Sequence, residues 1–302
     1  MNILKKMVCI LLGIIGIHTI QAEIITYPAE VTPGSWLCFR KDISVGKDAS
    51  HNLLKIAADS KYWLWINGEL IVREGNLKRG PNPKDTYCDI LRDVKGLVSG
   101  RNTIALLVWY FGKDGFSHRN SPTAGVSVDL TIGKQRYISD DSWKVSIHPS
   151  FYIPNGINPN YRLPESNIGF NAQKEVAFWD KDFDDALWQD AKVIKKELSG
   201  WNQLVERPIP MWKDYGLKDY VKVERKSDTL FVAYLPYNAQ VNPYIKLKAK
   251  VGEIIDIRTD NYCGGGTPNV YAEYITKNGI QEFEAWGWMN GHQVLYTIPK
   301  DV

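Results

Sequence analysis

Apolar and polar side chains alternate along much of this chain, which predicts β-strands because successive side chains of a strand point to opposite faces. Residues 61–66 and 69–72 are two such runs, separated by Asn67-Gly68. Both central residues of a type I′ turn need positive φ, so this dipeptide predicts a tight hairpin. In the first run, one predicted face carries Tyr62, Leu64 and Ile66, and the other carries Trp63 and Trp65.

Further strands are predicted downstream of this hairpin. Residues 102–111 are nearly all apolar, which indicates a central strand buried on both faces. Residues 125–132 alternate and predict another strand, and residues 135–147 predict a hairpin that turns at Asp140-Asp141. A short helix is predicted at residues 180–191.

The last hundred residues show the same strand pattern. Residues 245–249 and 253–259 predict a pair of strands joined by a turn, and residues 271–276 and 281–286 predict a second hairpin around residues 277–279. No long helical pattern occurs, so the fold class is all-β, with two β-sandwiches in series and few short helices.

The length of the chain and its first residues predict how the chain is divided. The 302 residues fit two domains. Residues 1–22 combine Lys5 and Lys6, an apolar stretch at 8–17 and a small residue, Ala22, which is the pattern of a secretory signal peptide. The predicted divisions are therefore a signal peptide at 1–22, a first domain at 23–203 and a second at 204–302. The signal specifies export, to the periplasm or the extracellular space.

Charge and cysteine usage exclude several classes of function. The formal charge of +3 falls to +1 without Lys5 and Lys6, so electrostatics favour neither nucleic acid nor an anionic membrane as partner. The mature chain keeps Cys38, Cys88 and Cys263, an odd number without metal-site spacing. Buried free thiols are expected, although export permits a Cys38–Cys88 disulfide. We predict no cofactor and no metal.

Two short motifs suggest a metal site and a catalytic pair, and each also has a simpler structural interpretation. Residues 180–185 are rich in aspartate, but an EF-hand requires Gly and Glu where the chain has Asp185 and Ala191, so a solvated loop is the prediction. Glu282 and Glu284 would share one strand face about 7 Å apart, the separation found in inverting glycosidases. Any Glu-x-Glu strand has this spacing, and a solvated face explains it equally well.

Aromatic side chains with polar neighbours suggest a carbohydrate site. Trp63 and Trp65 could stack on sugar rings, while Asp59, Asn67 and Arg73 hydrogen-bond sugar hydroxyls. The alternative is that these tryptophans belong to the core and their polar neighbours to turns.

Several stretches of the first predicted domain resemble the N-terminal jelly-roll domain of bacterial α-L-rhamnosidases, which is similar to galactose-binding-like sandwiches. They are residues 59–68 (DSKYWLWING), 100–105 (GRNTIA) and 108–112 (VWYFG). Residues 183–188 are similar to the Phe-Asp-Asp-Ser-x-Trp element that ends such domains, with Ala186 in place of serine.

The second predicted domain resembles the next part of the same family. Residues 206–210 look like the family's bridge, and residues 236–299 resemble its concanavalin-like β-sandwich. The motifs at 262–266, 273–274 and 287–292 carry this resemblance in combination.

The family hydrolyses terminal α-L-rhamnose with inversion, using carboxylates of an (α/α)₆ barrel that follows these β domains. No catalytic position of the family has a counterpart in this chain, which ends where the barrel would begin. The resemblance implies a non-catalytic N-terminal part whose partners are the barrel, in a longer form or neighbouring chain, and rhamnose-containing carbohydrate. A stand-alone carbohydrate-binding protein is the alternative, and a hydrolase using Glu282 and Glu284 is a third hypothesis.

Overall fold

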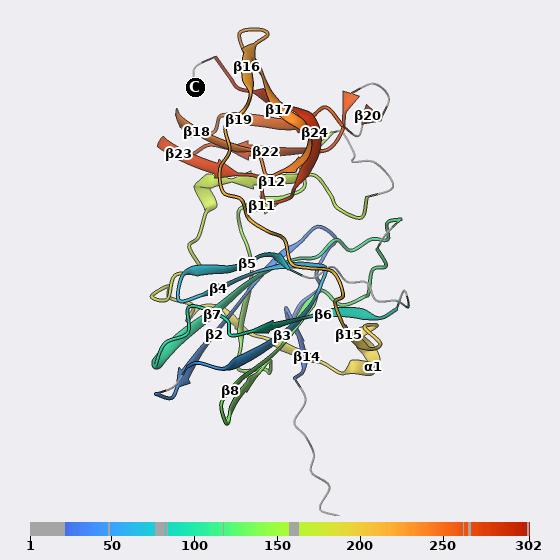
Figure 1. The fold of residues 1–302 in the computed structure, drawn as a ribbon, viewed down its shortest axis with the longest axis vertical. Coiled ribbons are helices and arrows are strands. Elements are labelled where there is room, and N and C mark those ends of the chain that lie inside the picture. Colours follow the sequence, from blue (N-terminus) through green and yellow to red (C-terminus); the bar gives the residue numbers. More distant parts are fainter. Residues whose placement is uncertain are drawn as a thin grey trace, which may run out of the picture.

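The computed structural model describes residues 22–47, 49–75, 82, 84–116, 118–156, 163–261, 263–264, 267–300 and 302. Residues 1–21 of the predicted signal peptide lie outside the described residues. The chain forms two lobes, one above the other in Figure 1, and each is built almost entirely of strands. Among the described residues the helices are a single-turn α1 (Lys196–Ser199) and a 3₁₀ turn, η1 (Ala172–Lys174). The all-β prediction is confirmed.

The lower lobe is a sandwich of two sheets. The first sheet has the order β14 (Lys192–Ile194), β1 (Ile24–Thr26), β8 (Gly125–Ile132), β3 (Asn52–Asp59), β6 (Thr86–Arg92), β15 (Leu204–Glu206), with β9 (Gln135–Ile138) also paired to β8. The second has the order β13 (Gln189–Asp190), β10 (Lys144–Ile147), β2 (Trp36–Val45), β7 (Gly100–Trp109), β4 (Lys61–Ile66), β5 (Glu69–Gly75).

The predicted hairpin is the β4–β5 pair, with Asn67 and Gly68 at φ 53° and 85°. Both faces of β4 are buried, because the second sheet is covered on both sides. Tyr62, Leu64 and Ile66 lie in the core between the two sheets, whereas Trp63 and Trp65 lie on the outer face, in a separate aromatic cluster. β7 lies between β2 and β4 and is buried almost throughout, as the apolar run predicts.

The upper lobe packs a large sheet against a small one. The large sheet has the order β11 (Phe151–Tyr152), β12 (Ile168–Asn171), β22 (Tyr271–Ile275), β19 (Ile254–Thr259), β24 (Met289–Thr297), β17 (Leu230–Val241), β16 (Lys222–Arg225). The pair β18 (Tyr244–Ala249) and β23 (Gly279–Glu284) forms the small sheet, and β20 (Cys263–Gly264) pairs with β21 (Thr267–Pro268). Tyr274 of the large sheet stacks on Phe283 of the small one, with ring centroids 4.4 Å apart.

The sheets cross the predicted domain boundary in both directions. β11 and β12 precede residue 204 in sequence, yet β12 pairs in parallel with β22 of the upper lobe. β15 begins at residue 204, yet it pairs in parallel with β6 of the lower lobe. β12 and β15 therefore tie the two lobes together (Figure 1).

Three predicted hairpins have correct strands but wrong partners. β9 pairs with β8, whereas β10 pairs with β2 and β13. β18 and β19 lie in different sheets, as do β22 and β23, so their connections cross the sandwich. Turn residues predict a change of direction equally well within a sheet and between two sheets, which explains the errors.

The helix predicted at residues 180–191 is also wrong, since this segment is a series of turns that ends in β13. The buried Arg40 explains the irregular backbone. Its guanidinium donates to the carbonyl oxygens of Phe178 and Asp180 and pairs with the Asp185 carboxylate, Nε–Oδ2 2.8 Å. A loop can direct these acceptors at one cation, whereas a helix would use the carbonyls internally.

Cys38, Cys88 and Cys263 are free thiols, as expected, but only the first two are buried and Cys263 is exposed. Cys38 lies on β2 and Cys88 on β6, in different sheets of the lower sandwich.

Candidate functional site

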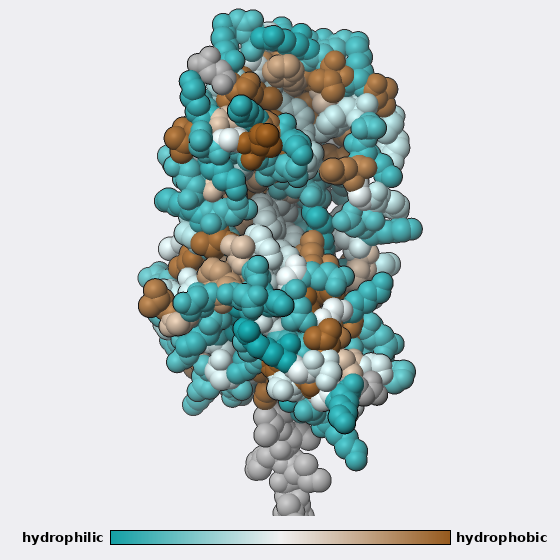
Figure 2. All heavy atoms as spheres, turned by 90° about the vertical axis from the view of Figure 1, so that its left-hand side faces the viewer, coloured by the Kyte–Doolittle hydropathy of each residue, from teal (hydrophilic) through white to brown (hydrophobic). Residues whose placement is uncertain are grey.

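A cleft of about 330 Å³ lies between the two lobes, bounded by β4 and β5 from below and by β23 from above. Figure 2 shows a recess in the surface at the level between the two lobes. Three residues of the predicted sugar site, Trp63, Trp65 and Arg73, line this cleft. Glu282 and Glu284 line it from the opposite lobe. The fold thus brings together two sets of residues that are more than 200 positions apart.

Tryptophan rings form the apolar wall of the cleft. Trp65 stacks on Trp179, with ring centroids 5.5 Å apart and ring planes 20° apart. Trp286, which follows β23, lies 6.3 Å from Trp65 at 58°. Trp179 and Trp286 are half-buried, so the wall is partly open to solvent.

Trp63 belongs more to the packing than to the open surface. Its side chain is only 1% exposed, and its ring contacts Trp36 at 5.2 Å and Trp286 at 5.7 Å. The rings of Trp36 and Trp109 stack behind it, 4.7 Å apart. This cluster covers the outer face of β4 and joins the lobes, so Trp63 supports the cleft from below.

Arg73 on β5 and Glu284 on β23 form an ion pair across the cleft. Nη1 lies 2.5 Å from Oε1, and Nη2 lies 3.4 Å from Oε2. Partial burial raises the pKa of the Glu284 carboxyl, and the Arg73 guanidinium opposes this rise. The two-point contact fixes the carboxylate against the lower lobe.

Glu282 lies on the same face of β23 and is more exposed. Its carboxylate accepts a hydrogen bond from Lys246 of β18, Nζ–Oε1 2.7 Å. Lys246 and Tyr244 lower the pKa of Glu282 by bonding to the ionised form. The two carboxyls therefore have different partners and pKa values shifted in opposite directions.

The other two predicted sugar-binding residues lie outside the cleft. Asn67 is half-buried in its turn, where it donates to Asn102 and to the carbonyl of Gly96. Asp59 is fully buried and accepts hydrogen bonds from the Ser60 and Ser121 hydroxyls. Both use their polar atoms to fix loops of the lower lobe.

Among the residues of the cleft that sequence reasoning missed are Trp179, Trp286 and Glu175. Trp286, two residues after the end of β23, continues the sequence alternation of Glu282 and Glu284, a signal that was available. Trp179 and Glu175 come from an irregular segment, where no periodicity indicates the direction of a side chain. Glu175 pairs with Lys277, Oε2–Nζ 2.9 Å.

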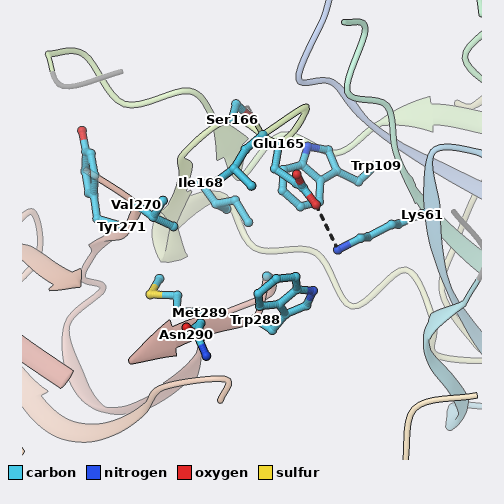
Figure 3. A pocket seen from close by; sticks show the side chains of 12 residues that line it. Lys61, Trp109, Glu165, Ser166, Ile168, Val270, Tyr271, Trp288, Met289 and Asn290 are labelled. Carbon is cyan, nitrogen blue, oxygen red and sulfur yellow. Dashed lines mark ion pairs between the residues drawn. The ribbon is translucent and has the colours of Figure 1, made fainter. Parts of the chain in front are cut away.

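A second, smaller pocket of about 50 Å³ is lined by residues of both lobes, among them Lys61 and Trp109 from the lower one and Tyr271 and Trp288 from the upper one (Figure 3). The buried Lys61 lies at its edge, with Nζ 3.6 Å from Glu165 and 3.5 Å from Glu74. Burial raises the pKa of Glu74, opposed by Lys61 and by a hydrogen bond from the backbone N–H of Trp288 in the upper lobe. A pocket of this size accommodates water-sized groups, so the larger cleft is the better candidate for a ligand.

Two other findings bear on possible chemistry. Within the described parts of the chain, no three His, Cys, Asp or Glu side chains are grouped to hold a metal ion. The same residues contain no helix long and apolar enough to span a membrane.

The comparisons with known proteins concern the fold. The sequence matches no protein-family model, and no curated protein matches it. The structure is similar to a rhamnosidase of glycoside hydrolase family 78 from Bacillus sp. GL1, with a TM-score of 0.76 and 14% identity over 92% of this chain and 53% of that one. An α-L-rhamnosidase from Dictyoglumus thermophilum gives a TM-score of 0.70 and 20% identity, over 93% of this chain and 34% of that one.

A third similar structure is the α-L-rhamnosidase of Streptomyces avermitilis, solved in complex with L-rhamnose. It gives a TM-score of 0.67 and 16% identity over 89% of this chain and 27% of that one. The chain thus spans between about a quarter and a half of these enzymes. At such identities the likeness establishes a shared fold of two β-sandwich lobes.

Proposed function

We propose that this chain is the N-terminal β-region of an exported α-L-rhamnosidase-like glycoside hydrolase, and that it supports a catalytic domain without being catalytic itself. The observation that carries the proposal is the fold. About nine-tenths of the chain superposes on these rhamnosidases, and it spans between 27% and 53% of their length. The catalytic domain would be supplied in a longer form or by a neighbouring chain.

The geometry of the cleft supports a non-catalytic role. An inverting glycosidase needs one protonated carboxyl at the leaving oxygen and one carboxylate that activates water. Both oxygens of Glu284 face Arg73, and Glu282 is paired with Lys246. Neither carboxyl is placed as a free proton donor, so Glu284 is better explained as part of the contact between the lobes and Glu282 as an exposed residue of the upper lobe.

The test is hydrolysis by the chain alone. We expect the folded chain to release no chromophore from a chromogenic α-L-rhamnoside over hours. Release that disappears in Glu282→Gln or Glu284→Gln would overturn the non-catalytic assignment and establish a site in the β domains.

Contact with rhamnose-containing carbohydrate is the second part of the proposal. The tryptophan wall and the carboxylates of the cleft are the groups that bind sugars elsewhere in proteins. The same observation favours the alternative function, a stand-alone carbohydrate-binding protein. The proposed function and this alternative differ in whether the chain associates with a catalytic domain. Co-purification from the producing cells would reveal such an association.

A further inference from the structure

The cleft between the lobes has the dimensions of a binding site for one small molecule. Its volume of about 330 Å³ lies at the lower end of the range for ligand pockets. β4 and β5 supply one wall, β23 supplies the other, and Trp179 closes the side. A ligand there would touch both lobes, so the site exists only in the assembled two-lobe chain.

The apolar part of the cleft matches the faces of a sugar ring. Trp65 and Trp179 are nearly parallel, while Trp286 is inclined at 58° to Trp65. Indoles in two orientations present an angled apolar wall, against which the C–H groups of a pyranose can pack. A flat aromatic ligand would match only one of the two orientations.

The polar part of the cleft matches hydroxyl groups. Glu175, Glu282 and Glu284 each carry a carboxylate that a lysine or arginine holds in place, Lys277, Lys246 and Arg73 respectively. A carboxylate has two oxygens and about four acceptor positions, so the ion pairs of Glu175 and Glu282, each made at one oxygen, leave capacity to accept from hydroxyls. Positioned acceptors of this kind cost little reorganisation on binding.

The charge of the lining selects among sugars. The three glutamates of the cleft are balanced by Lys277, Lys246 and Arg73, so a ligand meets carboxylates whose cations are already paired. A uronic acid would bring a further carboxylate against these groups, whereas a neutral sugar would not.

We propose that the cleft between the lobes binds one neutral pyranose ring, packed against Trp179 and Trp286 and hydrogen-bonded by Glu282 and Glu175. This inference rests on the proposed function only for the choice of rhamnose as the first probe. The inference places the sugar in the cleft, which is lined by residues of both lobes.

The experiment is calorimetric titration of the mature chain with methyl α-L-rhamnopyranoside, with methyl galactopyranoside and galacturonic acid as comparison probes. We expect saturable binding of a neutral pyranoside that is weakened about tenfold by Trp179→Ala, equivalent to about 1.4 kcal/mol. Glu282→Gln keeps the shape of an exposed side chain and should weaken binding severalfold, which covers the case in which Trp179→Ala fails to fold. Tyr237→Ala removes an exposed aromatic outside the cleft and should change nothing.

The outcomes separate the inference from the proposed function. Binding of galactoside but not rhamnoside, with the same sensitivity to the variants, supports the cleft and counts against rhamnose. No binding of any neutral pyranoside at tens of millimolar overturns the inference, as does binding that Trp179→Ala and Glu282→Gln leave unchanged. Tighter binding of galacturonic acid overturns the preference for neutral sugars. The hydrolysis assay is independent of all these results.

Discussion

Arg73 and Glu284 are 211 positions apart in sequence and form the ion pair that joins the two lobes across the cleft, with Nη1 2.5 Å from Oε1. Both side chains are about one-third exposed. Their geometry makes the cleft a property of the assembled chain, because one wall is held against the other at this point.

We predict that Arg73→Ala lowers the free energy of unfolding by about 1–2 kcal/mol. The change leaves a partly buried carboxylate unpaired, although solvent screening keeps the cost below that of a fully buried pair. Urea denaturation measures the effect. Lys246→Ala breaks an exposed pair and is the control, with a smaller expected cost because solvent screens that pair more fully. Equal effects of the two substitutions would show that Arg73 has no special place between the lobes.

Trp63→Ala should act on stability rather than selectively on sugar binding. Its ring is buried among Trp36 and Trp286, so truncation leaves a cavity that costs about 3–5 kcal/mol. Truncation of the half-buried Trp179 to alanine should lower the free energy of unfolding by less. Thermal unfolding compares the two variants. A Trp63→Ala variant with unchanged stability and abolished sugar binding would place Trp63 in the site itself.

The raised pKa of Glu74 predicts that the stability of the fold depends on pH. Burial raises its pKa in the folded state, so the folded protein holds this proton to higher pH than the unfolded chain does. Its contribution to stability is therefore most favourable below the unfolded pKa and declines as pH rises towards the folded pKa. Glu74→Gln should remove this decline.

The measurement is the difference in unfolding free energy between Glu74→Gln and the parent chain at several pH values from 4 to 8. The variant should gain relative to the parent as pH rises through this window. Glu282, whose pKa is lowered, should show the opposite pH dependence, because its contribution to the free energy of unfolding is lost as pH falls. A pH-independent difference for Glu74→Gln would contradict the assignment of its raised pKa.

Local features of the fold could be predicted from the sequence, because neighbouring residues determine them. Asn67 and Gly68 form the expected turn, and the two faces of β4 follow from simple alternation. The pairing of β23 with β18 was not predictable from the turn at residues 277–279, since the turn does not specify which sheet the next strand joins.

The cleft was only partly predictable for the same reason. Trp63, Trp65 and Arg73 stand out by residue type, and the sequence places them near one another on one hairpin. Asp59 is equally close in sequence, yet it is buried in hydrogen bonds to serines. Trp286 is distant in sequence and packs against Trp65, and only the arrangement of the two lobes reveals that contact.

The most direct test of the sugar cleft is a crystal structure of the folded chain grown with a saturating concentration of methyl α-L-rhamnopyranoside. We predict one sugar ring between the lobes, packed against Trp179 and Trp286 and within hydrogen-bonding distance of Glu282. A sugar bound only elsewhere, with the cleft open to solvent and free of ligand, would contradict the account.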